Sequence, residues 1–179
     1  MNDFTVKEHK KGNKGPYNFY MITISTSRFE KYGNVLSPLD AEDRSGQLME
    51  EMVLTAGHKI SGYSLIIDDE TSIIDAVTKA LRSDADIVVT SGGTGLTSKD
   101  VTIESVAPMF EKDIPGFGEL FRYKSIAQIG VSVILTRASA GVIAGKAVFC
   151  LPGSPAAVEL ALDEIIIPEA GHIVKHVRQ

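Results

Sequence analysis

The stretch Asp86-Ile87-Val88-Val89-Thr90-Ser91-Gly92-Gly93-Thr94-Gly95 decides the fold of this chain. Its first half is a continuous apolar run of strand length, which is typical of a strand buried on both faces of a parallel sheet. Its second half is a glycine loop, and the segment Asp100 to Ala107 that follows can be helical until Pro108. A buried strand that ends in glycines and leads into a helix predicts an open α/β sheet with a ligand-binding loop at its carboxyl edge.

Strands and helices alternate on both sides of this stretch, because apolar residues recur with a strand period in some segments and a helix period in others. The predicted elements, in chain order, are a strand at 19–26, a polar loop at 27–42, a helix at 43–56, a strand at 59–67, a helix from about 69, the strand at 86–91, a helix at 100–107, a helix around 117–126, a short hairpin near 142–151 and a last helix that Ser154 and Pro155 open. This order predicts a doubly wound α/β fold.

The length and net charge of the chain limit the number of domains and the kinds of partner to expect. The 179 residues fit one domain, which we place at 19–179 after a flexible basic tail at 1–18; the tail is alternatively an arm that docks on another subunit. The net charge of −5 does not suggest a nucleic-acid partner, because such proteins usually carry basic patches. We expect no signal peptide, and no apolar run approaches the ~18 residues of a membrane span. We expect a cytoplasmic protein with no nucleic-acid and no membrane partner.

The chain offers few groups for nucleophilic catalysis. Its one cysteine, Cys150, lies in an apolar strand segment and is expected to be a buried thiol. The four histidines are scattered, and we interpret all of them as solvated: His9, His58, His172 and His176. The sequence shows no convincing Ser/His or Cys/His arrangement.

The glycine loop has the features of an anion site. Glycines let the backbone approach a ligand and turn its amides toward it, and a helix start adds the positive end of the helix dipole. A P-loop needs glycine directly before its lysine, but Lys99 stands between Ser98 and Asp100. Ser98 also occupies the third glycine position of a dinucleotide motif. The residues therefore predict an anion site that is neither a P-loop nor a dinucleotide-binding loop. The alternative is a tight turn that binds no ligand.

Two aspartates stand where a strand gives way to a helix, Asp69 and Asp100. As helix caps they would contribute about 1 kcal/mol each, and residue type alone favours that interpretation. The functional alternative is that they converge at the carboxyl edge. Carboxylates beside a phosphate site repel the ligand unless a cation lies between them, so this alternative implies Mg²⁺.

Four motifs in register then point to a family. They are Ser91-Gly92-Gly93-Thr94-Gly95-Leu96-Thr97, Asp100-Val101-Thr102, Ile114-Pro115-Gly116-Phe117-Gly118-Glu119 and Leu151-Pro152-Gly153-Ser154-Pro155. From about Phe19 to Val174 the chain resembles the MogA/MoaB family of molybdenum-cofactor biosynthesis proteins. Its proline-glycine turn lacks the lysine of the MogA branch and is closer to the MoaB branch. The resemblance implies a three-layer α/β/α fold with a mostly parallel sheet.

The resemblance also implies a reaction and a site. Active members use Mg-ATP to adenylylate molybdopterin with release of pyrophosphate, and they assemble as homo-trimers or as hexamers built from two trimers. The catalytic acidic pair, which is also the implied Mg²⁺ ligand set, falls on Asp69 and Asp100. The residues expected to bind pterin and nucleotide are Ser91, Gly92, Gly93, Thr94, Gly95, Glu119, Pro152, Gly153 and Ser154.

One departure and two alternatives stay open. Family members often have Ser-Asp-Arg after the first strand, where this chain has Ser25-Thr26-Ser27-Arg28, so one acidic contact is missing there. A non-catalytic molybdopterin carrier and a trimeric scaffold of the same pathway are the alternatives to an enzyme. Because both aspartates are kept, we favour an active nucleotidyltransferase.

Overall fold

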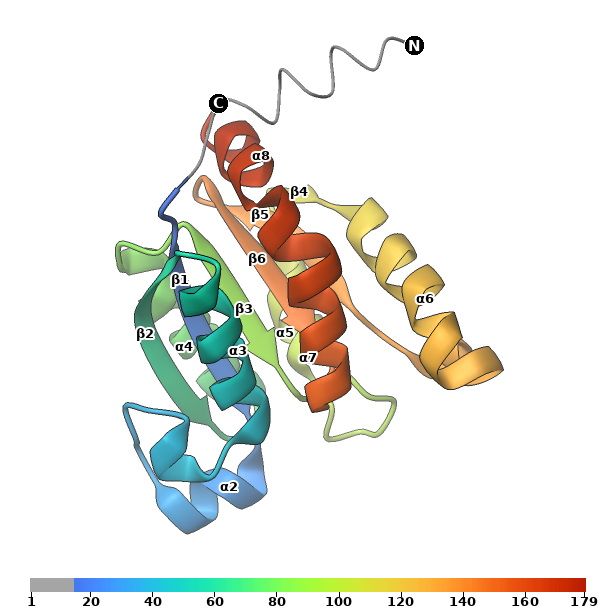
Figure 1. Cartoon of the computed structure of the whole chain (residues 1–179). Helices are drawn as coiled ribbons and strands as arrows, with labels where there is room; N and C mark the ends of the chain where they lie inside the picture. The colour runs from blue at the N-terminus through green and yellow to red at the C-terminus, as the bar shows by residue number, and fades with distance from the viewer. Residues whose placement is uncertain (1–14) are drawn as a thin grey trace, which may run out of the picture.

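A computed structural model describes residues 15–179 and shows a six-stranded sheet between two layers of helices (Figure 1). The order across the sheet is β2-β1-β3-β6-β5-β4. The strands are β1 (Asn18–Ile24), β2 (Lys59–Ile66), β3 (Ile87–Ser91), β4 (Lys112–Asp113), β5 (Ser139–Ile143) and β6 (Lys146–Leu151). The predicted three-layer α/β/α fold is confirmed.

Strand direction places four strand ends together. β1 runs parallel to both β2 and β3, and β3 runs parallel to β6. Only β5 runs against the other strands: it joins β6 through a tight hairpin and pairs antiparallel with both β6 and β4. The ends of β1, β2, β3 and β6 therefore meet at one edge of the sheet, which we call the carboxyl edge.

The helices divide between the two faces of the sheet. In Figure 1, α3, α7 and α8 lie in front of the sheet, and α4 and α5 lie behind it. The helical segments are α2 (Thr26–Tyr32), η1 (Leu39–Ala41), α3 (Arg44–Thr55), α4 (Glu70–Arg82), α5 (Thr102–Val106), η2 (Ala107–Met109), α6 (Pro115–Ile129), η3 (Gly130–Leu135), α7 (Pro155–Ala161), the π-helical turn η4 (Leu162–Ile166) and α8 (Ile167–Val177).

Alternation along the strands builds one apolar core on each face. In β1, Phe19 and Met21 point to the face covered by α3, whereas Tyr20 and Ile22 point to the face covered by α4. The same alternation in β3 buries every one of its residues, including Ser91 at its end. A strand buried on both faces fixes the position of the loop that follows it, which here is the glycine loop.

The predicted helix starts are confirmed where a side chain caps the helix. The Asp69 carboxylate accepts a hydrogen bond from the Ser72 amide at 3.2 Å at the start of α4. The Ser154 hydroxyl accepts one from the Ala157 amide at 3.2 Å, and Pro155 is the first residue of α7. Both caps satisfy amides that have no partner inside the helix.

Several expectations differ from the structure. The segment predicted as a polar loop contains the short helix α2, which no apolar pattern could predict because none of its residues is buried. The two-residue strand β4 was also too short to predict. His58 is not solvated: its ring is half-buried and stacks on Phe19 with a centroid distance of 5.4 Å, and burial lowers its pKa.

The structure also describes most of the chain near its two termini and the buried cysteine. Residues 1–14 of the predicted tail lie outside the described residues, while Tyr17 is only 6% exposed and β1 begins at Asn18. Cys150 is fully buried, and burial raises its pKa to about 12. His172 and His176 are exposed on α8, as expected. Between residues 15 and 179, no helix is both long and apolar enough to cross a bilayer.

Candidate functional site

A pocket of about 360 Å³ opens at the carboxyl edge, where β3 and β6 end. The glycine loop forms one wall, the proline-glycine turn after β6 forms a second, and the segment between η3 and β5 forms a third. Its lining residues are Gly92, Gly93, Thr94, Gly95, Asp100, Leu135, Thr136, Arg137, Pro152 and Gly153. Ligands of open α/β sheets bind at this kind of position.

Crowding of the strand ends explains the first two glycines. Gly92 and Gly93 both have positive φ, at +108° and +62°, a region that side chains disfavour. A Cβ on Gly92 would lie against the carbonyl oxygen of Ile24 in the neighbouring strand. A Cβ on Gly153 would come within 3.2 Å of the Gly92 Cα. The backbones of three segments therefore pack directly on one another here.

The loop is fastened to the helix that follows it. The Thr102 amide donates to the Gly93 carbonyl at 2.9 Å, and the Thr102 hydroxyl donates to the Gly92 carbonyl at 2.9 Å. Thr102 is fully buried and begins α5. These bonds hold two loop carbonyls away from the pocket, which suits a wall that binds an anion through amides.

Asp100 closes the loop and is held in its charged form. Its Oδ2 accepts hydrogen bonds from the Thr97 hydroxyl at 2.6 Å and from the Thr97 amide at 2.9 Å. These bonds, with smaller contributions from the Gly95 amide and the charge of Arg137, lower the pKa of Asp100. Asp100 thus brings a fixed negative charge to the pocket wall.

Asp68, which sequence reasoning did not single out, faces the same loop. A Cβ on Gly93 would lie 2.7 Å from its Oδ1, so the carboxylate fills the space that a side chain would take. That Oδ1 is enclosed and has no hydrogen-bond partner among residues 15–179. Burial raises the pKa of Asp68, the charges of Asp100 and Asp69 add to the rise, and hydrogen bonding from the Val101 amide opposes it.

One carboxylate oxygen of Asp69 is used at the start of α4. Its Oδ1 caps α4 through Ser72, and hydrogen bonding to Ser72 lowers the pKa of Asp69. Its Oδ2 is enclosed and has no partner in the described part of the chain. The cap that residue type favoured is therefore present, and one oxygen of Asp69 is still available at the carboxyl edge.

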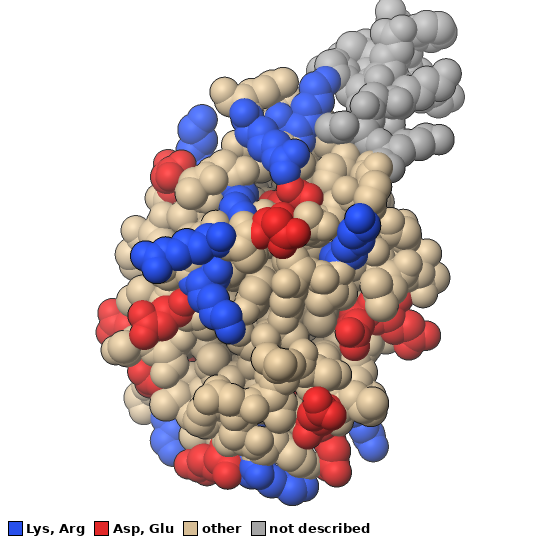
Figure 2. Space-filling model, turned by 90° about the vertical axis from the view of Figure 1, so that its left-hand side faces the viewer, with Lys and Arg blue, Asp and Glu red and all other residues tan. Residues whose placement is uncertain are grey.

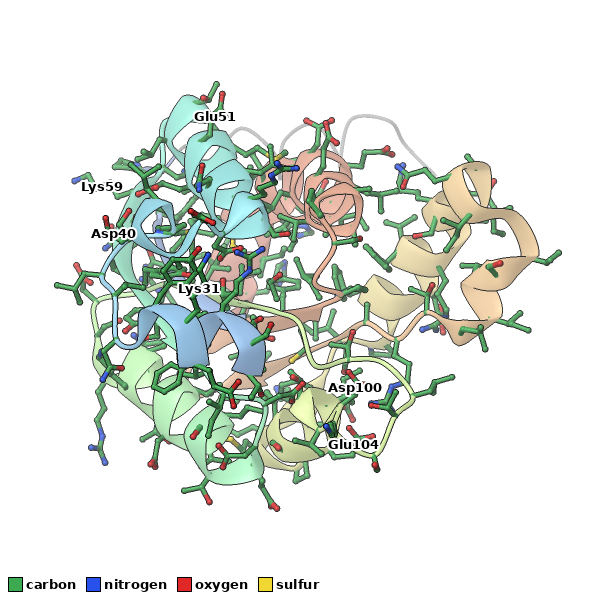
Figure 3. All side chains as sticks on the ribbon, turned by 90° about the horizontal axis from the view of Figure 1, so that it is seen from below. Lys31, Asp40, Glu51, Lys59, Asp100 and Glu104 are labelled. Carbon is green, nitrogen blue, oxygen red and sulfur yellow. The ribbon has the colours of Figure 1, made fainter. Side chains whose placement is uncertain are left out.

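Arg137 is the cation of the pocket. Its Nη1 and Nη2 form a bidentate ion pair with the Glu104 carboxylate of α5, at 2.7 and 2.8 Å. Its Nε donates to the Thr94 carbonyl at 2.9 Å. In Figure 3, Asp100 and Glu104 lie close together beneath the glycine loop. The pair with Glu104 raises the pKa of Arg137 and lowers that of Glu104.

A buried polar network supports the pocket from the side of α3. The Asp43 carboxylate is 2% exposed and accepts hydrogen bonds from the Thr23 hydroxyl at 2.6 Å and the Tyr63 hydroxyl at 3.0 Å. Burial and the charge of Asp43 raise the pKa of Tyr63. Two residues further on, the Ser45 hydroxyl donates to the Gly153 carbonyl at 2.8 Å. The start of α3 therefore fixes the proline-glycine turn.

Most of the predicted site residues come together. The pocket lining includes the predicted residues Gly92, Gly93, Thr94, Gly95, Asp100, Pro152 and Gly153. Ser91 is buried beneath the loop, and Ser154 is occupied as the cap of α7. Glu119 is exposed on α6 and does not line this pocket, because Phe117 and Phe121 take the inward positions of that helix.

Two charged residues of the site, Asp68 and Arg137, were not predicted because the sequence around each gives little indication of its role. Asp68 is adjacent to Asp69, and only the backbone direction at the end of β2 decides which of the two faces the loop. Arg137 stands alone before a short strand, 43 residues from the Thr94 carbonyl that it contacts. No local pattern links residues so far apart.

Comparison with known proteins agrees with the sequence resemblance. A family model described as a probable molybdopterin binding domain matches residues 20–172. The chain is 44% identical over 171 residues to the molybdenum cofactor biosynthesis protein B of Bacillus cereus, with 94% of this chain and 95% of that protein covered. It is 42% identical over 178 residues to a protein of Pyrococcus furiosus named molybdopterin adenylyltransferase, with 97% and 99% covered. A crystal structure of a molybdenum cofactor biosynthesis protein B superposes with a TM-score of 0.83 at 43% identity, covering 93% of this chain and 99% of that one.

Substitution of Gly93 should destabilise the protein as well as the site. In Gly93→Ala the Cβ would meet Thr102 and the Asp68 carboxylate, at a backbone conformation that costs a non-glycine residue about 1–2 kcal/mol. We expect the free energy of unfolding, measured with urea, to fall by about 2 kcal/mol or more. Gly116→Ala is the control, because nothing lies within 4 Å of its Cβ position and α6 gains a better helix former. An equal loss in both variants would refute the steric account.

The two carboxylates that face the loop should respond oppositely to neutralisation. At pH 7 Asp68 is a desolvated charge with a raised pKa, so Asp68→Asn should increase the free energy of unfolding. Asp100 has a lowered pKa, so Asp100→Asn should decrease it. Both differences should shrink in acid: the penalty from Asp68 disappears toward its unfolded value near 3.8, and the contribution of Asp100 is lost as pH falls through its lower folded pKa. Urea unfolding at pH 7 and about pH 3 checks the signs. Changes of the same sign at pH 7 would contradict this assignment.

Proposed function

The chain belongs to the molybdopterin-binding-domain family of molybdenum-cofactor biosynthesis proteins, and from that premise we propose that it is a molybdopterin adenylyltransferase of the cytoplasm. The observation that carries the proposal is the pocket of Gly92 to Gly95, in which loop backbone, Asp100 and Arg137 surround one cavity at the carboxyl edge. A Pyrococcus furiosus relative that aligns over nearly the whole chain bears the name of this activity.

The proposed reaction joins two phosphates. An oxygen of the terminal phosphate of molybdopterin attacks the α-phosphorus of ATP and forms a new phosphorus–oxygen bond. The bond from the α-phosphorus to the oxygen that bridges it to the β-phosphate breaks, and pyrophosphate leaves with the electron pair. The protein needs no nucleophile of its own, which fits the burial of Cys150, the one thiol in the chain.

The pocket suits this reaction because its task is to hold two anions together. Positioning and neutralisation of charge account for most catalysis of this type. The glycine loop and the proline-glycine turn approach each other within van der Waals contact, so that backbone forms much of the surface offered to a ligand. Arg137 adds a positive charge and Asp100 a negative one at the same wall.

The carboxylates fit a magnesium ion that comes with the nucleotide. Asp68 Oδ1 and Asp69 Oδ2 are enclosed oxygens with no partner among residues 15–179, and Asp100 acts electrostatically on Asp68. No group of three potential ligands in that range forms a complete metal site. Magnesium typically takes one or two carboxylates and completes its shell with water and substrate phosphates. We propose that Asp69 and Asp100 hold the ion or its waters, where it neutralises phosphate charge.

A carrier that binds molybdopterin without turnover is the second candidate. It is favoured by one observation, the engagement of Asp69 as the cap of α4, which leaves only one of its oxygens for metal. The curated relatives named molybdenum cofactor biosynthesis protein B do not specify an activity in their name. Nucleotide turnover by the purified protein distinguishes the two candidates.

We also propose that the protein assembles as a homo-trimer, or as a hexamer of two trimers, through the surface of α6 and η3. Helix α6 is apolar on both sides: Phe117 and Phe121 face the core, and further apolar residues face outward. The exposed apolar residues of this surface are Leu120, Tyr123, Ile126, Ile129, Val131, Ile134 and Leu135. A contiguous surface of this kind usually marks an interface, and copies of one chain associate symmetrically.

Neutralisation of either predicted catalytic aspartate should stop the reaction. In Asp69→Asn and Asp100→Asn, we expect release of pyrophosphate from Mg-ATP and molybdopterin to fall at least about a hundredfold, because charge that directs the metal is lost. Circular dichroism should show that both variants remain folded. Asp163→Asn, an exposed acid on η4, is the matched control and should keep full activity. Activity close to wild type in both variants would reduce Asp69 to the cap of α4 and Asp100 to a residue that only braces the loop through Thr97.

Assembly should depend on the outward apolar residues of η3. Val131 and Ile134 are 86% and 81% exposed in the isolated chain. The wild type should have at least the mass of a trimer by light scattering, whereas Val131→Glu combined with Ile134→Glu should yield monomers because burial of two charges opposes association. Leu54→Glu, at a 52% exposed position on α3, should leave the mass unchanged. A monomeric wild type would refute the assembly.

A further inference from the structure

We propose that Arg137 binds the phosphate of the ligand in the glycine-loop pocket and that Glu104 positions its guanidinium for this task. The ligand's identity rests on the proposed function, but binding of a phosphate group does not, since inorganic pyrophosphate can test it alone. Neither residue belongs to the motifs by which the sequence resembles its family.

The geometry leaves part of the guanidinium available. An arginine side chain has five N–H donors. The contacts with Glu104 and Thr94 use one hydrogen each on Nη1, Nη2 and Nε. Two N–H groups remain, on a side chain that lines the pocket and is 28% exposed. The two remaining N–H groups diverge, one on each Nη atom, so each offers a single charge-assisted hydrogen bond to a phosphate oxygen rather than a parallel pair.

Arg137 also fixes the loop that would bind the rest of the anion. Its Nε holds the carbonyl of the peptide between Thr94 and Gly95. Because a trans peptide is planar, the Gly95 amide must point to the opposite side, where it acts on the Asp100 carboxylate. One side chain therefore sets the orientation of a loop peptide and presents its own charge to the pocket.

The charge distribution makes this residue decisive. The chain has a net charge of −5, and Figure 2 shows positive and negative side chains interspersed over the face that it displays. Attraction of an anion must therefore come from local groups. Among residues 15–179, Arg137 is the only positively charged residue that lines the pocket, against the negative charge of Asp100.

A purely structural role explains the arrangement less well. Glu104 is 52% exposed, and ion pairs at such positions contribute little to stability, typically below about 1 kcal/mol. A bidentate pair at the pocket wall does, however, hold the guanidinium in one plane, so that no rotamer freedom is lost when a ligand binds. Glu104 is thus a positioning residue, and Arg137 the residue that touches the ligand.

The first experiment measures pyrophosphate binding to the full-length protein by calorimetry. We expect Arg137→Ala to weaken binding by about tenfold to a hundredfold, the usual effect of losing hydrogen bonds to a charged group. Arg137→Lys should recover only part of the affinity, because an ammonium on a flexible stem lacks the planar fork that the carboxylate of Glu104 holds in place. Arg82→Ala is the matched control: it removes the same charge from the exposed end of α4 and should change affinity less than about twofold. Unchanged affinity in a folded Arg137→Ala variant would overturn the proposal.

The second experiment asks whether substitution of Glu104 strengthens or weakens pyrophosphate binding. Loss of a negative charge near an anion site should tighten binding if charge alone mattered. If Glu104 positions Arg137, Glu104→Gln should weaken pyrophosphate binding while the midpoint of thermal unfolding stays within a few degrees of wild type. Tighter binding would refute the positioning role. If the wild type binds pyrophosphate through Arg137 but shows no adenylyl transfer, the proposed function fails and this inference stands.

Discussion

The close packing of backbone at Gly92 is the constraint on which the site depends. Gly92 leaves β3 with positive φ, in contact with the carbonyl of Ile24 on one side and with Gly153 on the other. No side chain fits there, so the ends of three strands meet as bare backbone at one point of the carboxyl edge. Parallel pairing of β1, β3 and β6 makes this possible, because only parallel strands bring successive carboxyl ends to the same edge. A pocket walled by main chain follows from this packing, and such a wall suits phosphate.

Around this backbone lie several acidic side chains and one arginine. Asp100 is stabilised as an anion by Thr97, Asp68 is enclosed against Gly93, and Arg137 joins the loop to α5 through Glu104. The pKa of Asp68 is raised and that of Asp100 is lowered, and Arg137 is the cation near them. A polyphosphate that enters such a site needs further positive charge. For the nucleotide of the proposed function, that requirement is the physical reason to propose magnesium.

Local sequence patterns predicted the helices and strands that are buried or capped. They did not predict features whose position depends on packing between residues far apart in the sequence. The strand before the glycine loop and the helix that Ser154 opens could be predicted, because apolar runs and capping residues act within a few positions. Helix α2 buries no residue and left no pattern, and Glu119 belongs to a family motif yet faces outward on α6. Asp68 lies against the glycine loop, and Arg137 lines the pocket, only because the ends of β2 and β3 and the start of β5 lie at the same edge, which depends on the order of strands rather than on neighbours in sequence. The site's charges were therefore harder to predict than its backbone.

The most direct test of the account follows one phosphorus atom. Purified full-length protein would be incubated with molybdopterin, magnesium and ATP labelled at the α-phosphate, and the products separated. The account predicts that the label moves to the pterin and that unlabelled pyrophosphate appears in equal amount. Label that stays in ATP, or leaves as ADP, would contradict the claim that this pocket joins two phosphates by attack at the α-phosphorus.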